Sequence, residues 1–171
     1  MTDDRYRAYL KDDPISRLYA QYFLQADVVF NYYQKLSRQR AQKGRLSRNK
    51  EVDEVNLLKL WLASLYVVVE GFQAPSMQQA FQEWKDTSLN IRVHCSLITH
   101  KLTQLGNELR IFRNATFQFQ KDPEKHAKLL RIKSRHHPIT WAEELHQEFA
   151  MLFSEYRGLK FTEYLVQAPD H

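Results

Sequence analysis

The chain has 171 residues, 43% of them hydrophobic and 13% aromatic, which suits one folded domain and excludes a largely disordered chain. A single cysteine, Cys95, excludes an intrachain disulfide framework and favours a reducing cytosol. The formal net charge of +5 has a local origin, because residues 35–50 hold seven basic residues and no acid.

The first part of the chain predicts a polar arm followed by a helix. Residues 1–12 form the arm and contain no apolar stretch typical of a signal peptide. Asp13 and Pro14 have the form of a helix N-cap and first helical residue. Apolar residues then recur at spacings of three and four from Ile15 to Leu36, which predicts a core-facing helix. We expect the tyrosines of this apolar stripe, Tyr19, Tyr22 and Tyr33, in the core, and stacking on nucleic-acid bases is the alternative.

The basic residues come next and predict a basic interhelix loop over residues 37–51. Such a cluster can neutralise phosphates and release counterions, which gives nucleic acids a salt-dependent affinity. A solvated loop without a ligand is the alternative. The residues proposed to contact phosphate are Arg38, Arg40, Lys43, Arg45, Arg48 and, farther along the chain, Arg110.

A second helix is predicted over residues 53–70, with Gly71 as its C-terminal cap. It is apolar nearly all round after Lys59 and should be the most buried helix. Its apolar run from Leu60 to Val69 is too short to span a bilayer, so we expect no membrane association. Glu70 is an acid at the end of this run and is a candidate partner for an arginine.

Four further helices complete the prediction. A short helix over residues 77–85 follows Pro75, and a long one over residues 90–110 should bury Val93, Leu97, Leu102, Leu105 and Leu109.

After a short basic helix predicted over residues 124–133, Thr140 and Glu143 have the form of a capping box, and their helix should end near Gly158. The prediction is therefore an all-α single domain over residues 1–171, a bundle of four to five long helices with short accessory helices. His94, Cys95 and His100 lack matching ligands elsewhere, so no structural metal is expected.

The stretch LRIFRNATFQFQ, residues 109–120, places Arg113 and Asn114 among large apolar side chains. A guanidinium in that setting needs an anion. The anion is either a structural carboxylate, such as that of Glu70, or a nucleic-acid phosphate, which the planar guanidinium matches well. The sequence has no glycine-rich phosphate loop, HExxH, CxxC or nucleophile-elbow motif, so it offers no other familiar chemistry.

Three segments in order resemble the HEPN (higher eukaryotes and prokaryotes nucleotide-binding) superfamily, in particular its small bacterial and phage-associated members. They are LYVVVEGF (65–72), the long helix running into LRIFRNATFQFQ (109–120), and WAEELHQEFAMLF (141–153). The resemblance covers most of the chain after residue 51, and only the Arg-Asn stretch is specific. It implies a helical bundle that is commonly a homodimer, an RNA ligand, no cofactor, and a role in a toxin, defence or mobile-element system with a cognate partner protein.

The nuclease members of that family carry an arginine, a polar residue and, several positions on, a histidine. Arg113 and Asn114 match the first two, but Gln118 stands where the histidine would be. An amide cannot exchange protons near neutral pH, and loss of the acid/base typically costs ~100- to 10,000-fold in rate. The resemblance therefore implies an RNA-binding protein with weakened or lost ribonuclease activity.

Two alternatives remain at this stage. One is a dimeric helical interaction module in which Arg113 pairs with Glu70 and no nucleic acid binds. The other is an active metal-independent ribonuclease with an unrecognised acid/base. His126 lies beyond the family spacing and is a weak substitute for the missing histidine.

Overall fold

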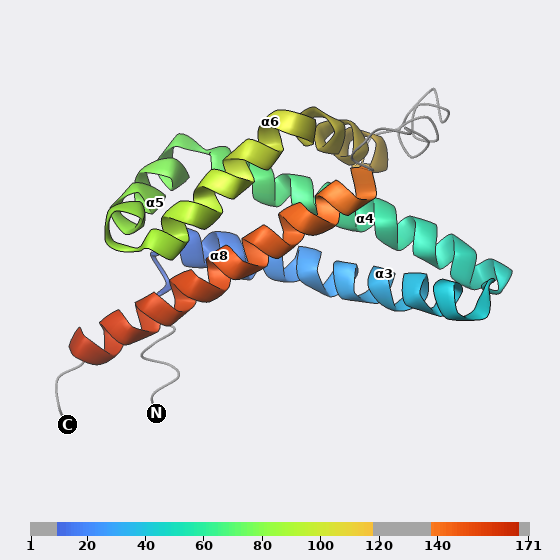
Figure 1. Ribbon diagram of the computed structural model, residues 1–171, viewed down its shortest axis with the longest axis horizontal. Coiled ribbons are helices and arrows are strands. Elements are labelled where there is room, and N and C mark those ends of the chain that lie inside the picture. Colours follow the sequence, from blue (N-terminus) through green and yellow to red (C-terminus); the bar gives the residue numbers. More distant parts are fainter. Residues whose placement is uncertain (1–9, 118–137, 168–171) are drawn as a thin grey trace.

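The computed structural model describes residues 10–117 and 138–167. These residues form helices and contain no strand, which confirms the all-α class. In chain order the elements are α2 (Pro14–Leu18), the π-helical turn η1 (Tyr19–Phe23), α3 (Leu24–Lys43), α4 (Arg48–Gln73), α5 (Pro75–Thr87), α6 (Leu89–Phe117) and α8 (Pro138–Gln167). Figure 1 shows α3 and α4 as a long hairpin whose tip projects beyond the crossing helices α6 and α8.

The first helix begins as predicted and contains an unpredicted π-helical turn. The Asp13 carboxylate accepts a hydrogen bond of 2.6 Å from the Ser16 backbone N–H, which confirms the N-cap. Leu18 and Phe23 are both buried although they lie five residues apart, a spacing that an α-helix would turn by about 140°. The wider turn of η1 brings both onto the core face. The sequence from Pro14 to Lys43 therefore keeps one apolar side despite the change in spacing.

The second helix is longer than predicted, and Gly71 is not its cap. α4 runs from Arg48 to Gln73 and continues through Gly71. A Cβ at Gly71 would lie 2.4 Å from Cδ1 of Leu18. Glycine is needed there because α2 crosses α4 closely, so the residue serves helix packing rather than helix termination.

Two glycine substitutions separate the gain in helix propensity from the cost of crowding Leu18. Gly158→Ala should stabilise the protein by about 0.5–1 kcal/mol, because Gly158 lies inside α8 with open space around an added Cβ. Gly71→Ala gains the same helical contribution but overpacks against Leu18, which costs about 1–3 kcal/mol. In urea denaturation, Gly71→Ala should therefore be less stable than Gly158→Ala by that amount. Equal stability of the two variants would contradict a close crossing.

The apolar stretch of α4 lies in the core. Within the described ranges, α4 is the one helix long and apolar enough to cross a membrane by length and composition. Many of its apolar side chains are buried in the bundle, among them Trp61, Leu62, Leu65, Val68 and Val69. These buried side chains confirm the prediction that this helix contributes strongly to the core.

The predicted basic interhelix loop over residues 37–51 is wrong, because most of that segment is helical. α3 continues to Lys43 and α4 begins at Arg48, so only residues 44–47 connect them. Gly44 adopts a left-handed φ of 72°, and its N–H donates 2.8 Å to the Arg40 carbonyl, which closes α3. An Arg40–Glu54 ion pair and the buried Leu46 then tie the two helix ends together. These contacts hold the basic side chains in fixed helical directions.

The predicted inward face of α6 is partly wrong. Val93 and Leu97 are 45% and 40% exposed, and the residues of α6 that are buried in the core are Ile91, Cys95 and Ile98. The real stripe is displaced by about two residues, because both sets have helical spacing and spacing alone does not say which one faces the bundle. Farther along α6, the predicted inward residues Leu102 and Leu109 do pack in the core.

The last helix also has different ends from those predicted. α8 starts at Pro138, so Thr140 lies within it and is not a cap, and it continues past Gly158 to Gln167. Proline at the first helical position accounts for the earlier start. The predicted apolar face is confirmed by the buried residues Leu145, Phe149, Leu152, Phe153 and Tyr156. The helix predicted over residues 124–133 lies outside the described residues.

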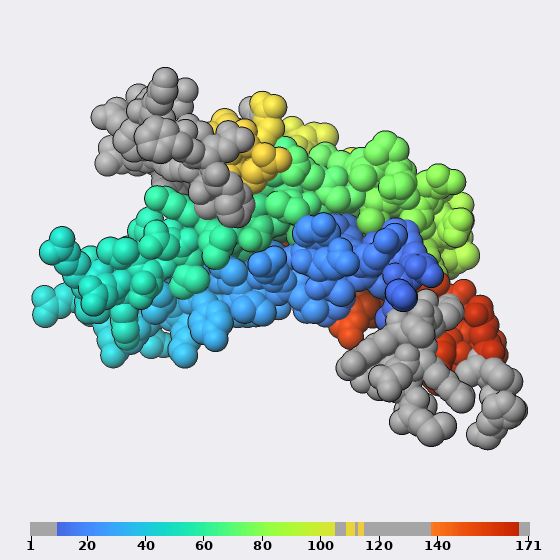
Figure 2. Space-filling model, turned by 180° about the vertical axis from the view of Figure 1, so that it is seen from behind, coloured from blue at the N-terminus to red at the C-terminus, as the bar shows by residue number. Residues whose placement is uncertain are grey.

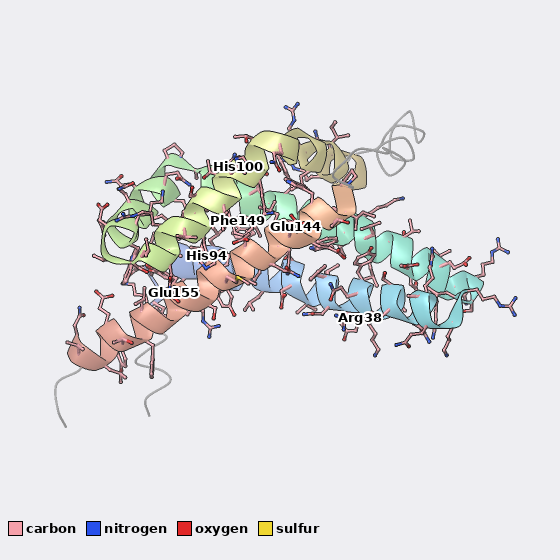
Figure 3. The ribbon with its side chains drawn as sticks, in the orientation of Figure 1. Arg38, His94, His100, Glu144, Phe149 and Glu155 are labelled. Carbon is pink, nitrogen blue, oxygen red and sulfur yellow. The ribbon has the colours of Figure 1, made fainter. Side chains whose placement is uncertain are left out.

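Polar pairs join α6 to α8 along their exposed side. Asn90 donates 3.1 Å to Glu155, and Lys101 Nζ lies 2.6 Å from Glu144. Figure 3 labels His94 between these two pairs, and its Nδ1 lies 3.0 Å from Glu148. The alternation of these contacts along both helices fixes them in an antiparallel arrangement.

His146 occupies a polar position inside the core. It is 2% exposed, and its ring packs against Phe23 and Phe30. Trp61 Nε1 donates 3.3 Å to Nδ1 of His146, so the ring proton resides on Nε2, which donates 3.0 Å to Asp27. Burial lowers the pKa of His146 although Asp27 acts in the opposite direction. The neutral ring is therefore the form that this core accommodates.

Candidate nucleic-acid interface

A groove of about 950 Å³ runs along the α3–α4 hairpin. Its cations are Lys35, Arg38, Lys43 and Lys50, and its one acid is Asp53. Its amides are Asn31, Gln34, Gln39, Gln42 and Asn56, and its apolar residues are Tyr32, Leu36, Leu57 and Leu60. Figure 3 shows Arg38 on the projecting part of α3, and Figure 2 shows from behind how far this hairpin extends past the other helices. The groove therefore lies along the hairpin that projects beyond α6 and α8.

The cations of the groove are not neutralised by the described residues, and two of them are oriented by hydrogen bonds. Arg38 Nη2 donates 3.0 Å to Gln34, and Lys50 Nζ donates 3.1 Å to Gln39. Because both acceptors are neutral amides, they orient the side chains and leave the charges uncompensated. Lys35 and Lys43 make no hydrogen bond or ion pair with any other described residue. Four positive charges thus face one carboxylate in an open groove.

The other predicted phosphate contacts of the hairpin differ from these. Arg40 is paired with Glu54, which is 10% exposed, so its charge is already balanced. Arg45 and Arg48 are exposed at the tip and do not line the groove. The predicted set therefore divides into groove residues, tip residues and one structural arginine.

The Arg113 centre lies at the contact of α6 with α4. Nη2 of Arg113 donates to both carboxylate oxygens of Glu70 at 2.9 and 3.0 Å, and Nη1 donates 2.9 Å to the Asn114 side-chain oxygen. The guanidinium also lies 5.3 Å from the ring centre of Tyr66. The side chains of Arg113 and Glu70 are 31% and 43% exposed. Of the two anions that the sequence left open for Arg113, a structural carboxylate and a nucleic-acid phosphate, the structure shows the carboxylate of Glu70, at the surface rather than in the core.

This pairing limits the chemistry of the centre. A phosphate approaching Arg113 would have to displace Glu70 or share the guanidinium with it, and the two anions would repel each other. Burial raises the pKa of the Tyr66 hydroxyl, and the Glu70 carboxylate raises it further. Tyr66 is therefore a poor proton donor to a base near neutral pH. Arg110 is exposed one turn before Arg113 and is open to solvent.

The two basic regions do not form one site. On α4, Glu70 lies ten residues from Leu60, at the near end of the groove, and twenty residues from Lys50. At a rise of ~1.5 Å per residue, the Arg113 centre is therefore about 15 Å from the near end of the groove and about 30 Å from Lys50. Gln118, the third residue of the degenerate motif, lies outside the described residues. Its role as the replacement for a catalytic histidine stays a prediction.

The groove contains residues that the sequence alone did not single out. Tyr32, which is not part of the predicted apolar stripe, is 59% exposed, and Leu60 is 39% exposed although the second helix was expected to be buried nearly all round. The sequence does hold a signal for Tyr32, because the neighbouring Tyr33 is the residue that matches the spacing of the buried stripe. Two adjacent tyrosines on a helix point about 100° apart, so one of them had to face outward.

Comparison of the chain with protein-family models, curated proteins and solved structures found no match. The HEPN resemblance thus rests on the residues that suggested it. Among the described residues, no three His, Cys, Asp or Glu side chains are grouped so that they could hold a metal ion. The site is therefore described by its cations, amides and apolar side chains.

Proposed function

We propose that this protein binds RNA through the α3–α4 hairpin and is a HEPN-like protein whose ribonuclease activity is weak or lost. The observation that carries the proposal is the uncompensated charge of the groove. Lys35, Arg38, Lys43 and Lys50 line it against Asp53 alone, and the two with hydrogen-bond partners contact neutral amides. Phosphates are the anions that would complete such an arrangement, since each contact releases condensed counterions from the nucleic acid.

The proposal assigns the Arg113 centre a secondary role. Arg113 and Asn114 retain the polar part of the family motif, while Glu70 already occupies the guanidinium. A centre with a neutralised cation and Gln118 in place of histidine lacks a proton-transfer group for efficient cleavage. The wider context, a homodimer in the cytoplasm that serves a defence or toxin system with a cognate partner protein, rests on the resemblance and on the single cysteine.

A dimeric interaction module without RNA is the second candidate, and the Arg113–Glu70 pair favours it. Buried and half-buried arginines usually serve packing, and this one joins α6 to α4 within one chain. Under this alternative the hairpin is only solvated. The groove supports RNA binding over this alternative, because four cations line it and Asp53 is the one acid among its lining residues.

RNA binding measured against salt concentration tests the proposal. We expect a labelled 12-nucleotide oligouridylate to bind the full chain at low salt, with the logarithm of the association constant falling linearly against the logarithm of salt. Absence of binding even at about 20 mM salt, where phosphate contacts are strongest, would favour the interaction module.

A separate cleavage experiment tests the degenerate motif. Gln118→His should raise RNA cleavage by about 100-fold or more, because imidazole restores a proton-transfer group. Arg113→Ala added to that variant should abolish the gain, whereas neither change should alter binding in the groove, whose near end lies about 15 Å away along α4. Cleavage by the unaltered chain that Arg113→Ala removes would instead identify an active ribonuclease with another acid/base.

A further inference from the structure

The groove has two kinds of surface, and their arrangement suggests which form of RNA it accepts. Its cations suit phosphates, whereas Tyr32 and Leu60 offer exposed apolar surface within the same recess. The side-chain amides that line it outnumber the apolar residues and can hydrogen-bond to the edges of bases. A ligand that fills the groove should therefore present anionic, planar and hydrogen-bonding groups together.

We infer that the groove is selective for single-stranded RNA and that Tyr32 is a stacking platform for an unpaired base. This inference rests on the proposed RNA-binding function and adds the substrate class and a specificity-determining residue. The ring of Tyr32 is 59% exposed in the groove, beside Lys35. Base stacking on aromatic side chains next to cations is the usual way of binding single strands, because every unpaired base has a free face.

Double-stranded RNA fits these features less well. Its bases are stacked and paired inside the helix, so it presents mainly phosphates and 2′-hydroxyl groups to a protein. Such a ligand could contact Arg38 and Lys43 but would leave Tyr32 and the leucines in water. The groove also follows α3 from Asn31 to Lys43, a length of about 18 Å at ~1.5 Å per residue, which is short for a duplex-binding surface.

An acidic amphipathic peptide helix is the other ligand that a basic groove could take. Such a helix needs a continuous apolar floor for its apolar stripe. Only four apolar residues line this groove, Tyr32, Leu36, Leu57 and Leu60, and they share the lining with five amides and four cations. A surface that combines amides, cations and an aromatic ring is better suited to contact nucleic-acid bases than the leucines of a peptide helix.

The test measures binding of the full chain to three probes at about 50 mM salt. They are a 12-nucleotide oligouridylate, the duplex of that strand with oligoadenylate, and polyglutamate of similar charge. We expect the single strand to bind at least about 10-fold more tightly than either of the others. Equal or tighter binding of the duplex would overturn the single-strand assignment. If polyglutamate bound as tightly as RNA, the groove would recognise negative charge alone.

Substitutions of tyrosine test the stacking platform. Tyr32→Ala should weaken single-strand binding by about 5- to 100-fold without changing the salt slope, because stacking releases no counterions. Tyr32→Phe keeps the ring face and should bind nearly as the wild type does. Tyr22→Ala is the matched control, since Tyr22 is 44% exposed but does not line the groove.

The outcomes separate this inference from the proposed function. If no RNA probe binds, the RNA-binding function itself fails. If the single strand binds and Tyr32→Ala binds as tightly as the wild type, RNA binding stands and the stacking role of Tyr32 is wrong.

Discussion

Replacing Lys35, Arg38, Lys43 and Lys50 together by glutamine should lower the affinity for single-stranded RNA by roughly 100- to 1,000-fold at 0.1 M salt. Counterion release contributes about 0.7 log units per contact for each tenfold drop in salt, so four contacts amount to nearly three log units relative to 1 M salt. For the same reason the slope of log affinity against log salt should become shallower by about 3. Fluorescence anisotropy over a salt series measures both quantities.

A second fourfold variant controls for net charge. Glutamine at Lys11, Arg17, Lys85 and Arg92 removes the same number of charges from residues that do not line the groove. Long-range attraction should decline equally in both variants, but only the groove variant should lose the contact-dependent slope. Equal losses in the two variants would mean that RNA responds to overall charge and that the hairpin is no specific interface.

His146→Ala should destabilise the protein by about 3–5 kcal/mol at pH 7.5. The change leaves a cavity among Phe23 and Phe30, and truncation of a buried large side chain costs about 2–5 kcal/mol. It also deprives the Trp61 indole N–H of its acceptor, and an unsatisfied buried donor costs about 1–3 kcal/mol. Urea denaturation measures the loss, and His100→Ala, at an exposed position, should change stability by less than about 0.5 kcal/mol.

The same histidine predicts a loss of stability in acid. Burial lowers the pKa of His146 in the folded state below the ordinary value of 6.5. Between those two pKa values the unfolded chain binds a proton that the folded chain does not, so stability falls as the pH falls. The loss should begin near pH 6.5, proceed at up to about 1.4 kcal/mol per pH unit, and stop below the folded-state pKa. Protonation of Nδ1 would set a donor against the Trp61 N–H.

A variant that does not titrate at this position isolates the effect. His146→Gln keeps a polar side chain there, and the other histidines are retained, so their contributions cancel when the wild type and the variant are compared. The wild type should lose stability relative to His146→Gln between pH 7 and pH 5. A constant difference over that range would contradict a neutral, buried His146.

The helices could be predicted from sequence because their signals are local. The Asp13 cap, the apolar run in α4 and the buried face of α8 depend on residues a few positions apart, and all three were found. The errors concern choices made by packing. A glycine after an apolar run, such as Gly71, is typical of a helix end. Its actual role is to leave room for Leu18 of a neighbouring helix, which the sequence does not show.

The candidate site was predictable in composition but not in arrangement. The density of basic residues was clear from the sequence, and Glu70 was one of the two kinds of anion considered for Arg113. The sequence did not predict which of these cations pair with an acid, because Arg40 meets Glu54 only after Gly44 turns the chain back on itself. The exposure of Tyr32 likewise follows from how α3 lies against α4.

The π-helical turn η1 determines where this chain can change in length. It contains one residue more than an ordinary helix would need between Leu18 and Phe23, and Ala20 and Gln21 within it face solvent. Deleting one of these exposed residues would leave the side chains before and after the turn on the same face. An equivalent deletion in α4 would rotate every later side chain of that helix by about 100°. Natural variants that differ by a single residue should therefore be tolerated in η1 and excluded from the core helices.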